Sequence, residues 1–254
     1  DSLAAYEGAY RRSVEAPEAF WAEVARGFRW HRPFSEVCTW DFAGPSVRWF
    51  ADGLVNITEN VLDRHLALRG GQTAIHWEPN DPADSRRSFT YQALHDEVCR
   101  VANGLKAQGV GRGDRVVLYM PMVPELLFAV LACARIGAVH SVVFAGFSAQ
   151  ALADRIQDAG AVAVMTADGV RRGVKSVPLK PLVDEAPAGC PSVRSVWVFP
   201  CTGEPVALLA GRDVAWADAV AGQSPVCAAE PMGAEDPLFI LYTSGSTGKP
   251  KGVV

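Results

Sequence analysis

From residue 73 onward, short apolar runs alternate with segments of helical periodicity. Strands are predicted at residues 73–77, 115–120, 139–144 and 162–166, which are rich in β-branched and other apolar side chains. Helices are predicted between them, at residues 91–108 after the cap Thr90, at 124–135, and at 149–159 after the cap Ser148. Because one helix separates successive apolar strands, we expect right-handed crossovers and a largely parallel sheet with flanking helices. The predicted fold class is α/β.

The two ends of the chain differ from this middle part. Residues 1–70 are rich in aromatic side chains and contain two amphipathic helical runs, one beginning at Pro17 and one around residues 57–66. We expect a mainly helical extension over 1–70 that packs on a second domain at 71–254. Residues 168–236 have a weaker period, with strands predicted at 195–199 and near 205–209. A last apolar strand is predicted at 238–242.

Composition narrows the class of protein. The 254 residues are 49% hydrophobic and 20% charged with a net charge of −4, which is typical of a globular protein and unfavourable for general nucleic-acid binding. Charge, Gly or Pro interrupts the apolar runs before the roughly 18 to 20 residues that a membrane span needs. Six widely spaced cysteines without a CxxC pattern indicate reduced thiols in an intracellular protein.

The strand at 238–242 runs directly into a loop that concentrates hydroxyls, glycines and lysines. Glycines let backbone N–H groups converge, hydroxyls donate to phosphate oxygens, and lysines add positive charge, so the loop is predicted to bind a polyphosphate. A Walker A loop is disfavoured because only two residues separate Gly245 from Gly248 and Pro250 occupies the hydroxyl position. A flexible linker would not explain the apolar strand before it. The predicted phosphate ligands are Thr243, Ser244, Gly245, Ser246, Thr247, Gly248, Lys249 and Lys251.

The stretch YTSGSTGKPKG at residues 242–252 resembles the phosphate-loop signature of the adenylate-forming superfamily. Further segments at 49–56, 113–116, 119–122, 131–138, 140–148 and 234–239 resemble the acetyl-CoA synthetases of the short-chain acyl-CoA synthetase group. The resemblance implies the N-terminal part of the large domain of such an enzyme. It also implies ATP-dependent activation of acetate to acetyl-AMP, followed by thioester formation with CoA. Mg²⁺ would enter with the nucleotide.

The same resemblance implies CoA contacts at Ala145, Gly146, Arg171 and Lys175, with Ala145 at a position where Gly is commoner. The reaction needs no protein nucleophile, and no catalytic residue or metal ligand is assigned within the chain. His95 and His140 are interpreted as packing residues, and Asp81, Asp84 and Asp114 as turn residues.

Several alternatives stay open at the level of sequence. The acid could be propionate or another short-chain acid, and a non-catalytic nucleotide- or CoA-binding regulator would share the scaffold. The expected partners are small molecules only, with no nucleic acid and no membrane, and the protein could be a monomer or a homodimer. A cytoplasmic location is expected, with the mitochondrial matrix as the alternative. In the family, the acyl and adenine pockets and the C-terminal lysine lie beyond the phosphate loop, so we expect no ligase turnover from these residues alone.

Overall fold

The computed structural model describes residues 2–81, 84–173, 175–186, 190–244, 248 and 250–254. The chain forms two compact units. The N-terminal unit comprises Asp1–Arg64 with Pro231–Asp236, and the sheet unit comprises His65–Glu230 with Pro237–Val254. Among the described residues, no helix is long and apolar enough to cross a membrane.

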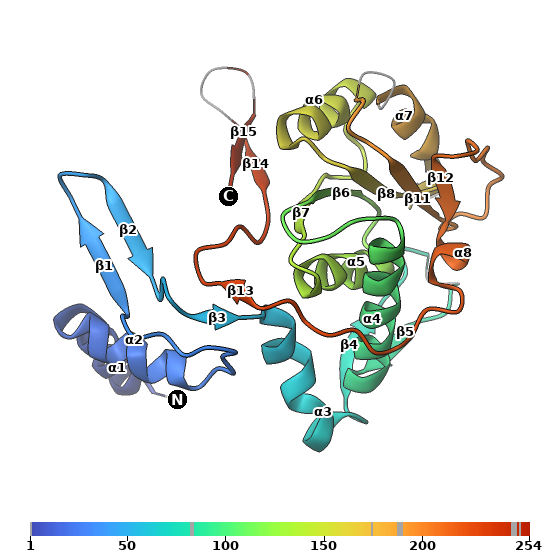
Figure 1. Ribbon diagram of the computed structural model, residues 1–254. Helices are drawn as coiled ribbons and strands as arrows, with labels where there is room; N and C mark the ends of the chain where they lie inside the picture. The colour runs from blue at the N-terminus through green and yellow to red at the C-terminus, as the bar shows by residue number, and fades with distance from the viewer. Residues whose placement is uncertain (1, 82–83, 174, 187–189, 245–247, 249) are drawn as a thin grey trace. The chain divides into compact units, whose positions relative to one another are not determined.

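Five parallel strands form the centre of the sheet unit (Figure 1). They are β6 (Arg115–Tyr119), β7 (Val139–Val142), β8 (Ala163–Ala167), β11 (Ser195–Phe199) and β12 (Asp213–Ala215). Their order across the sheet is β12-β11-β8-β6-β7, so the chain moves outward first in one direction and then in the other. This is a doubly wound arrangement whose topological switch point lies between β6 and β8. The predicted α/β class is confirmed.

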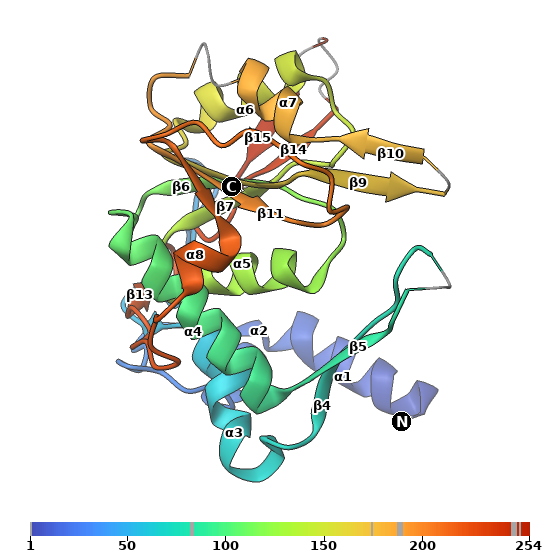
Figure 2. The same ribbon diagram turned by 90° about the vertical axis from the view of Figure 1, so that its right-hand side faces the viewer.

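Helices cover both faces of this sheet. They are α4 (Tyr91–Ala107), α5 (Pro124–Arg135), α6 (Ala149–Ala159), α7 (Lys180–Glu185) and α8 (Trp216–Val220). Helices α6 and α7 lie over one face, and α4, α5 and α8 lie over the other (Figures 1 and 2). Both predicted caps form, since Thr90 Oγ1 accepts from the Ala93 amide at 3.1 Å and Ser148 Oγ from the Ala151 amide at 3.3 Å.

Side chains alternate between the two faces along each strand. Val117 and Tyr119 of β6 belong to the apolar cluster that includes residues of α6 and α7. Trp197 of β11 points to the opposite face, where its ring meets Trp216 edge to face at 5.7 Å. A Cβ at Gly104 of α4 would come 2.7 Å from the Trp197 ring, so glycine permits this close approach of helix and sheet.

Three antiparallel hairpins complete the sheet unit. They are β4 (Thr73–Trp77) with β5 (Arg87–Thr90), β9 (Gly169–Arg172) with β10 (Lys175–Pro178), and β14 (Leu241–Thr243) with β15 (Lys251–Val253). Phe239, just before β14, forms a parallel bridge with His140 of β7, and the Ile240 amide donates to the His140 carbonyl at 2.9 Å. The hairpin β14–β15 therefore continues from the β7 edge of the sheet.

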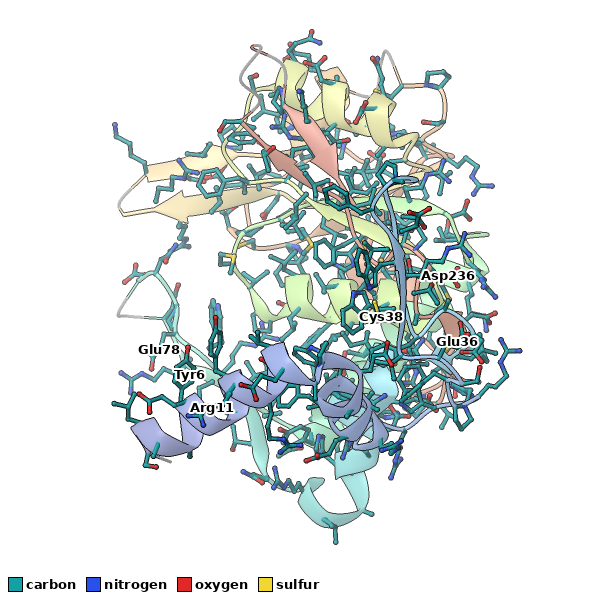
Figure 3. The ribbon with its side chains drawn as sticks, turned by 90° about the vertical axis from the view of Figure 1, so that its left-hand side faces the viewer. Tyr6, Arg11, Glu36, Cys38, Glu78 and Asp236 are labelled. Atoms are coloured by element: carbon teal, nitrogen blue, oxygen red, sulfur yellow. The ribbon has the colours of Figure 1, made fainter. Side chains whose placement is uncertain are left out.

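The N-terminal unit contains both helices and short strands. Its elements are α1 (Leu3–Glu15), α2 (Pro17–Arg26), β1 (Cys38–Asp41), β2 (Ser46–Trp49), β3 (Leu54–Val55), the π-helical η1 (Glu59–Asp63) and β13 (Met232–Gly233), which pairs with β3. The helix α3 (Arg64–Arg69) carries the chain into the sheet unit. Figure 3 labels Tyr6 and Arg11 on α1, where Tyr6 is exposed, and Cys38 on β1. The expectation of a mainly helical extension missed its β1–β2 hairpin.

Three details of the sequence prediction in the sheet unit were wrong. The apolar strand predicted at 238–242 is present only from Leu241, where β14 begins, with an isolated bridge at Phe239 before it. The strand near 205–209 does not form, and the edge position is taken by β12, which pairs with β11 in a parallel register. Pro205 has no N–H to donate to a ladder, whereas β12 follows directly on a turn in which the Leu209 amide bonds Asp213 Oδ2 at 2.8 Å. Strand β7 also ends two residues earlier than predicted, because the chain turns away into the loop at 143–147.

Candidate functional site

The predicted phosphate loop connects β14 to β15. In this hairpin Thr243 lies directly opposite Lys251, and both residues are exposed. Gly248 has a φ of +90°, a conformation that favours glycine. Four of the predicted ligands, Gly245, Ser246, Thr247 and Lys249, lie outside the described residues, and Ser244 follows Thr243. The structure thus brings a hydroxyl and a lysine together at the base of the loop.

Tyr242 fixes this hairpin to α6. Its phenol donates to Asp158 Oδ2 at 2.7 Å, and the Arg155 guanidinium lies 5.2 Å from the centre of its ring. Burial, reinforced by the Asp158 carboxylate, raises the pKa of the Tyr242 phenol above its ordinary value. The phenol therefore stays protonated at neutral pH and remains a hydrogen-bond donor.

The loop at 144–147, which follows β7, carries the predicted residues Ala145 and Gly146. Arg172 Nη2 donates to the Ala145 carbonyl at 2.7 Å, and its guanidinium lies 5.0 Å from the Phe144 ring centre. A Cβ at Gly146 would overlap the same guanidinium, so only glycine fits there without displacing Arg172. Tyr119 Oη donates to the Phe147 carbonyl at 2.7 Å and holds the end of the loop.

Hairpin β9–β10 carries the predicted residues Arg171 and Lys175. Because side chains alternate along a strand, Arg171 and Arg172 point to opposite faces of the hairpin. Arg172 contacts the loop at 144–147, whereas Arg171 Nη1 lies 3.8 Å from Asp81 Oδ2. Lys175 pairs with Arg172 in the register and is exposed. Of the three cations, Arg172 is therefore the one that the structure brings to Ala145 and Gly146.

Asp168 holds the base of this hairpin. Its buried carboxylate accepts the amides of Gly169 at 2.6 Å, Cys201 at 2.8 Å, Thr202 at 2.9 Å and Gly203 at 2.8 Å. The carboxylate joins the start of β9 to the turn that follows β11. Charge-assisted bonds of this kind are stronger than bonds between neutral groups, so Asp168 fixes the direction in which the hairpin leaves the sheet.

A cleft of about 330 Å³ opens at the carboxyl ends of β6, β8 and β11. Its lining includes Met122, Arg171 and Cys201, one from the segment after each of these strands, together with Trp77 and Arg87 of the β4–β5 hairpin. Burial, with the nearby Asp168 carboxylate as the next cause, raises the pKa of the Cys201 thiol to about 11. The cleft lies at the switch point, where doubly wound sheets bind their ligands.

The two histidines considered at the sequence level are both buried. Burial lowers the pKa of His140 to about 4, so its ring is neutral at pH 7. That ring lies 5.7 Å from the Phe239 ring, and its Nδ1 has no hydrogen-bond partner within the described part of the chain. His95 lies in α4, with Nε2 at 3.6 Å from Cys99 Sγ.

Within the described ranges, no group of three or more His, Cys, Asp or Glu side chains is arranged to hold a metal ion. Asp114 Oδ2 accepts from the Gly111 amide at 3.0 Å, as expected of a turn residue. The six cysteines are free thiols.

Comparison with known proteins shows the family of this chain. A model of the family described as AMP-binding enzyme matches residues 62–254. The chain belongs to the AMP-binding enzyme family. A second model, described as acetyl-coenzyme A synthetase N-terminus, matches residues 6–61. The resemblance identified from the phosphate loop and the aromatic extension is confirmed.

Curated relatives of this chain align with almost all of it. Acetyl-coenzyme A synthetase of Novosphingobium aromaticivorans is 55% identical over 253 residues, which is 99% of this chain and 39% of the relative. Acetyl-coenzyme A synthetase 2 of Pseudomonas putida is 55% identical over 249 residues, which is 98% of this chain and 38% of the relative. The solved structure of acetoacetyl-CoA synthetase from Streptomyces lividans superposes with a TM-score of 0.87 at 29% identity, over 96% of this chain and 37% of that one. The chain therefore spans about two fifths of the length of these relatives.

Sequence reasoning missed four residues that organise this candidate site. They are Asp168, Arg172, Arg155 and Asp158. Strand alternation would have separated Arg171 from Arg172 if a strand had been predicted at residues 169–172. The partners of Asp168 at 201–203 lie more than 30 positions along the chain, so no local pattern indicated them.

Proposed function

We propose that the protein to which this chain belongs is an AMP-forming acetate–CoA ligase. The observation that carries the proposal is the pairing of Thr243 with Lys251 across a hairpin that continues from the sheet edge. The match of both family models along the chain, and the names of the 55% identical relatives, support acetate as the acid. The division into an extension at 1–70 and an incomplete AMP-binding domain at 71–254 is part of the proposal.

In the first half-reaction, an acetate oxygen attacks the α-phosphorus of ATP. A carboxylate–phosphorus bond forms, the bond to the bridging oxygen breaks, and pyrophosphate leaves with that electron pair. Two anions must approach one another, so charge on the β- and γ-phosphates has to be neutralised. We assign this task to Thr243, Ser244, Gly245, Ser246, Thr247, Gly248, Lys249 and Lys251. Removing one such donor is expected to cost on the order of 10² to 10³ in rate.

In the second half-reaction, the CoA sulfur attacks the acyl carbonyl carbon of acetyl-AMP. A carbon–sulfur bond forms, the carbon–oxygen bond to phosphate breaks, AMP leaves, and the thiol proton is released. The CoA phosphates need cations and the pantetheine needs a close backbone approach, which Arg171, Lys175, Ala145 and Gly146 are proposed to supply. Arg172 joins this set because it holds the Ala145 carbonyl.

Magnesium is proposed to arrive bound to the nucleotide. The hydroxyls and lysines of the phosphate hairpin are not a ligand set for a resident divalent cation, and the described residues contain no carboxylate cluster of that kind. When bound to the phosphates, Mg²⁺ would neutralise part of their charge. No step above depends on it.

The location and the identity of the acid belong to the same proposal. The relatives compared above are bacterial, which supports a cytoplasmic location over the mitochondrial alternative. The acyl pocket decides between acetate and propionate, and the difference of one methylene is worth about 1–3 kcal/mol. In the full-length protein, a kcat/KM for acetate at least tenfold higher than that for propionate would support acetate as the substrate. A higher kcat/KM for propionate would identify propionate as the substrate instead.

The proposal is tested by exchange of labelled pyrophosphate into ATP, catalysed by the full-length protein. Exchange that requires acetate, followed by stoichiometric AMP and acetyl-CoA formation when CoA is added, is the expected result. Binding of ATP or CoA without exchange would instead indicate a non-catalytic regulator. The 254 residues alone are expected to give no exchange, because the chain covers about 39% of the enzymes it matches.

A further inference from the structure

Arg155 is a buried cation enclosed by two aromatic rings. Its guanidinium carbon lies 4.7 Å from the ring centre of Phe147 and 5.2 Å from that of Tyr242, and Nη1 donates to the Ala151 carbonyl at 2.6 Å. Only 8% of the residue is exposed. A cation removed from water in this way is attracted more strongly to an aromatic face than an exposed cation is, so both ring contacts are expected to matter.

The two rings belong to two different segments of the site. Phe147 ends the loop that holds Ala145 and Gly146, and Tyr242 lies in β14 of the hairpin that holds Thr243 and Lys251. Each segment also has an anchor of its own: Tyr119 Oη bonds the Phe147 carbonyl, and the Tyr242 phenol bonds Asp158. Arg155 is the side chain that contacts both rings at once.

The flat guanidinium is suited to this position. It can present one face to each ring while its edge donates hydrogen bonds, whereas a lysine ammonium is a compact charge without a stacking face. Helix α6 supports Arg155, because the helix is capped at Ser148 and its apolar side packs on the sheet. A rigid helix thus sets the position of one cation, and that cation sets the position of two segments.

We infer that Arg155 is a positioning residue that fixes the hairpin β14–β15 and the loop at 144–147 relative to one another. The inference rests on the proposed function for the identity of the two ligands. It assigns Arg155 no contact with either substrate. Loss of its two ring contacts is therefore expected to weaken the binding of ATP and the binding of CoA together, although the two substrates are proposed to contact different segments.

The kinetic test uses the full-length protein and four variants. Arg155→Met keeps length and apolar packing but loses charge and planarity, and is expected to raise the KM of ATP and the KM of CoA by about tenfold each. Arg155→Lys restores the charge and is expected to recover part of both losses. Tyr242→Phe is expected to affect the KM of ATP alone, and Phe147→Leu that of CoA alone. Arg194→Met, at a half-exposed arginine 3.7 Å from Asp114, is the matched control and should leave both constants unchanged.

Hydrogen exchange provides a readout that does not need activity. In Arg155→Met, the amides of residues 143–147 and those of β14 and β15 should both exchange faster, while Tyr242→Phe should affect β14 and β15 only. A change confined to one segment, or a lower melting temperature with unaltered KM values and exchange, overturns the inference. If wild-type protein gives no acetate-dependent exchange of pyrophosphate, the proposed function fails, and the amide measurement still decides the role of Arg155.

Discussion

The two hairpins that carry the proposed contacts to ATP and CoA are held in different ways. Hairpin β9–β10 is fixed at its base by one buried carboxylate, Asp168, which accepts four backbone amides. Hairpin β14–β15 is fixed by a side chain of its first strand, Tyr242, which bonds Asp158 and lies against Arg155. Isolated two-stranded hairpins are only marginally stable in water, so both depend on these anchors.

The difference indicates how each hairpin responds to change. A carboxylate that satisfies several amides acts as a unit, and its loss leaves all of them unpaired in a buried place. A phenol and a stacked cation are separate contacts that can be lost one at a time. The first hairpin should therefore fail abruptly, and the second should weaken in steps.

The largest effect is expected at Asp168. Asp168→Ala should lower the free energy of unfolding by on the order of 4 kcal/mol, because several buried N–H groups lose a charged acceptor. Urea denaturation measures this loss. Asp154→Ala, which removes an exposed carboxylate bonded to Gln150 at 2.8 Å, is the control and should change stability by less than about 0.5 kcal/mol. Equal losses of stability in the two variants would contradict the anchoring role of Asp168.

The next effect is expected when the pH is lowered. It concerns His140 of β7, whose carbonyl accepts the amide of Ile240 just before β14. Burial lowers the pKa of His140 to about 4, below the ordinary value of about 6.5. The folded state therefore favours the neutral ring, so this contribution is complete above about pH 6.5 and is lost as pH falls toward 4. The loss should be on the order of 3 kcal/mol at pH 4. His140→Gln should unfold with a weaker dependence on pH between 6.5 and 4, and an unchanged dependence would contradict the assignment.

A smaller effect is expected at the contact between the loop at 144–147 and the first hairpin. Gly146→Ala places a Cβ on the movable end of the Arg172 side chain, so the guanidinium must leave the Ala145 carbonyl, and the loss of that hydrogen bond should cost about 1.5 kcal/mol of stability. In the full-length protein, the KM of CoA should rise while that of ATP stays constant. If the KM of ATP changes equally, the contact does not belong to the CoA side.

The smallest effect is expected at Tyr242. Tyr242→Phe removes the bond to Asp158 and should lower stability by about 1 kcal/mol, as for a single hydrogen bond. Because the pKa of the phenol is raised in the folded protein, the advantage of tyrosine over phenylalanine should be complete below about pH 10 and decrease above it. Stability curves of the two proteins at pH 8 and pH 10.5 measure this, and a constant difference would exclude a role for the phenol proton.

The same two hairpins show how far the sequence could predict the molecule. The sheet and its helices were predicted because their signals are local: apolar β-branched runs, the caps Thr90 and Ser148, and the spacing of the turns. The phosphate-binding loop was proposed from a motif within a few positions, but the pairing of β14 with β15 on either side of it was not expected. Its anchors were not predicted either, because Arg155 and Asp158 lie more than 80 positions before Tyr242 and look like ordinary polar residues of an amphipathic helix.

Hairpin β9–β10 was missed for a related reason. A short run of arginines next to glycine is typical of an exposed turn, and only pairing with β10 gives the two arginines opposite directions. The strand near 205–209 was the opposite error, because it was predicted and does not form. Its run of apolar residues contains a proline, which lacks the N–H that pairing in the sheet requires.

The central claim is that the hairpin with Thr243 opposite Lys251 binds the phosphates of ATP. Calorimetric titration of ATP into the full-length protein tests it directly, with Lys251→Met as the variant, because Lys251 is exposed and its loss should not affect folding. We expect Lys251→Met to weaken ATP binding by about tenfold or more at an unchanged melting temperature, as for a lost charge-assisted contact. Equal affinity of the wild type and the variant, at equal stability, would contradict the claim.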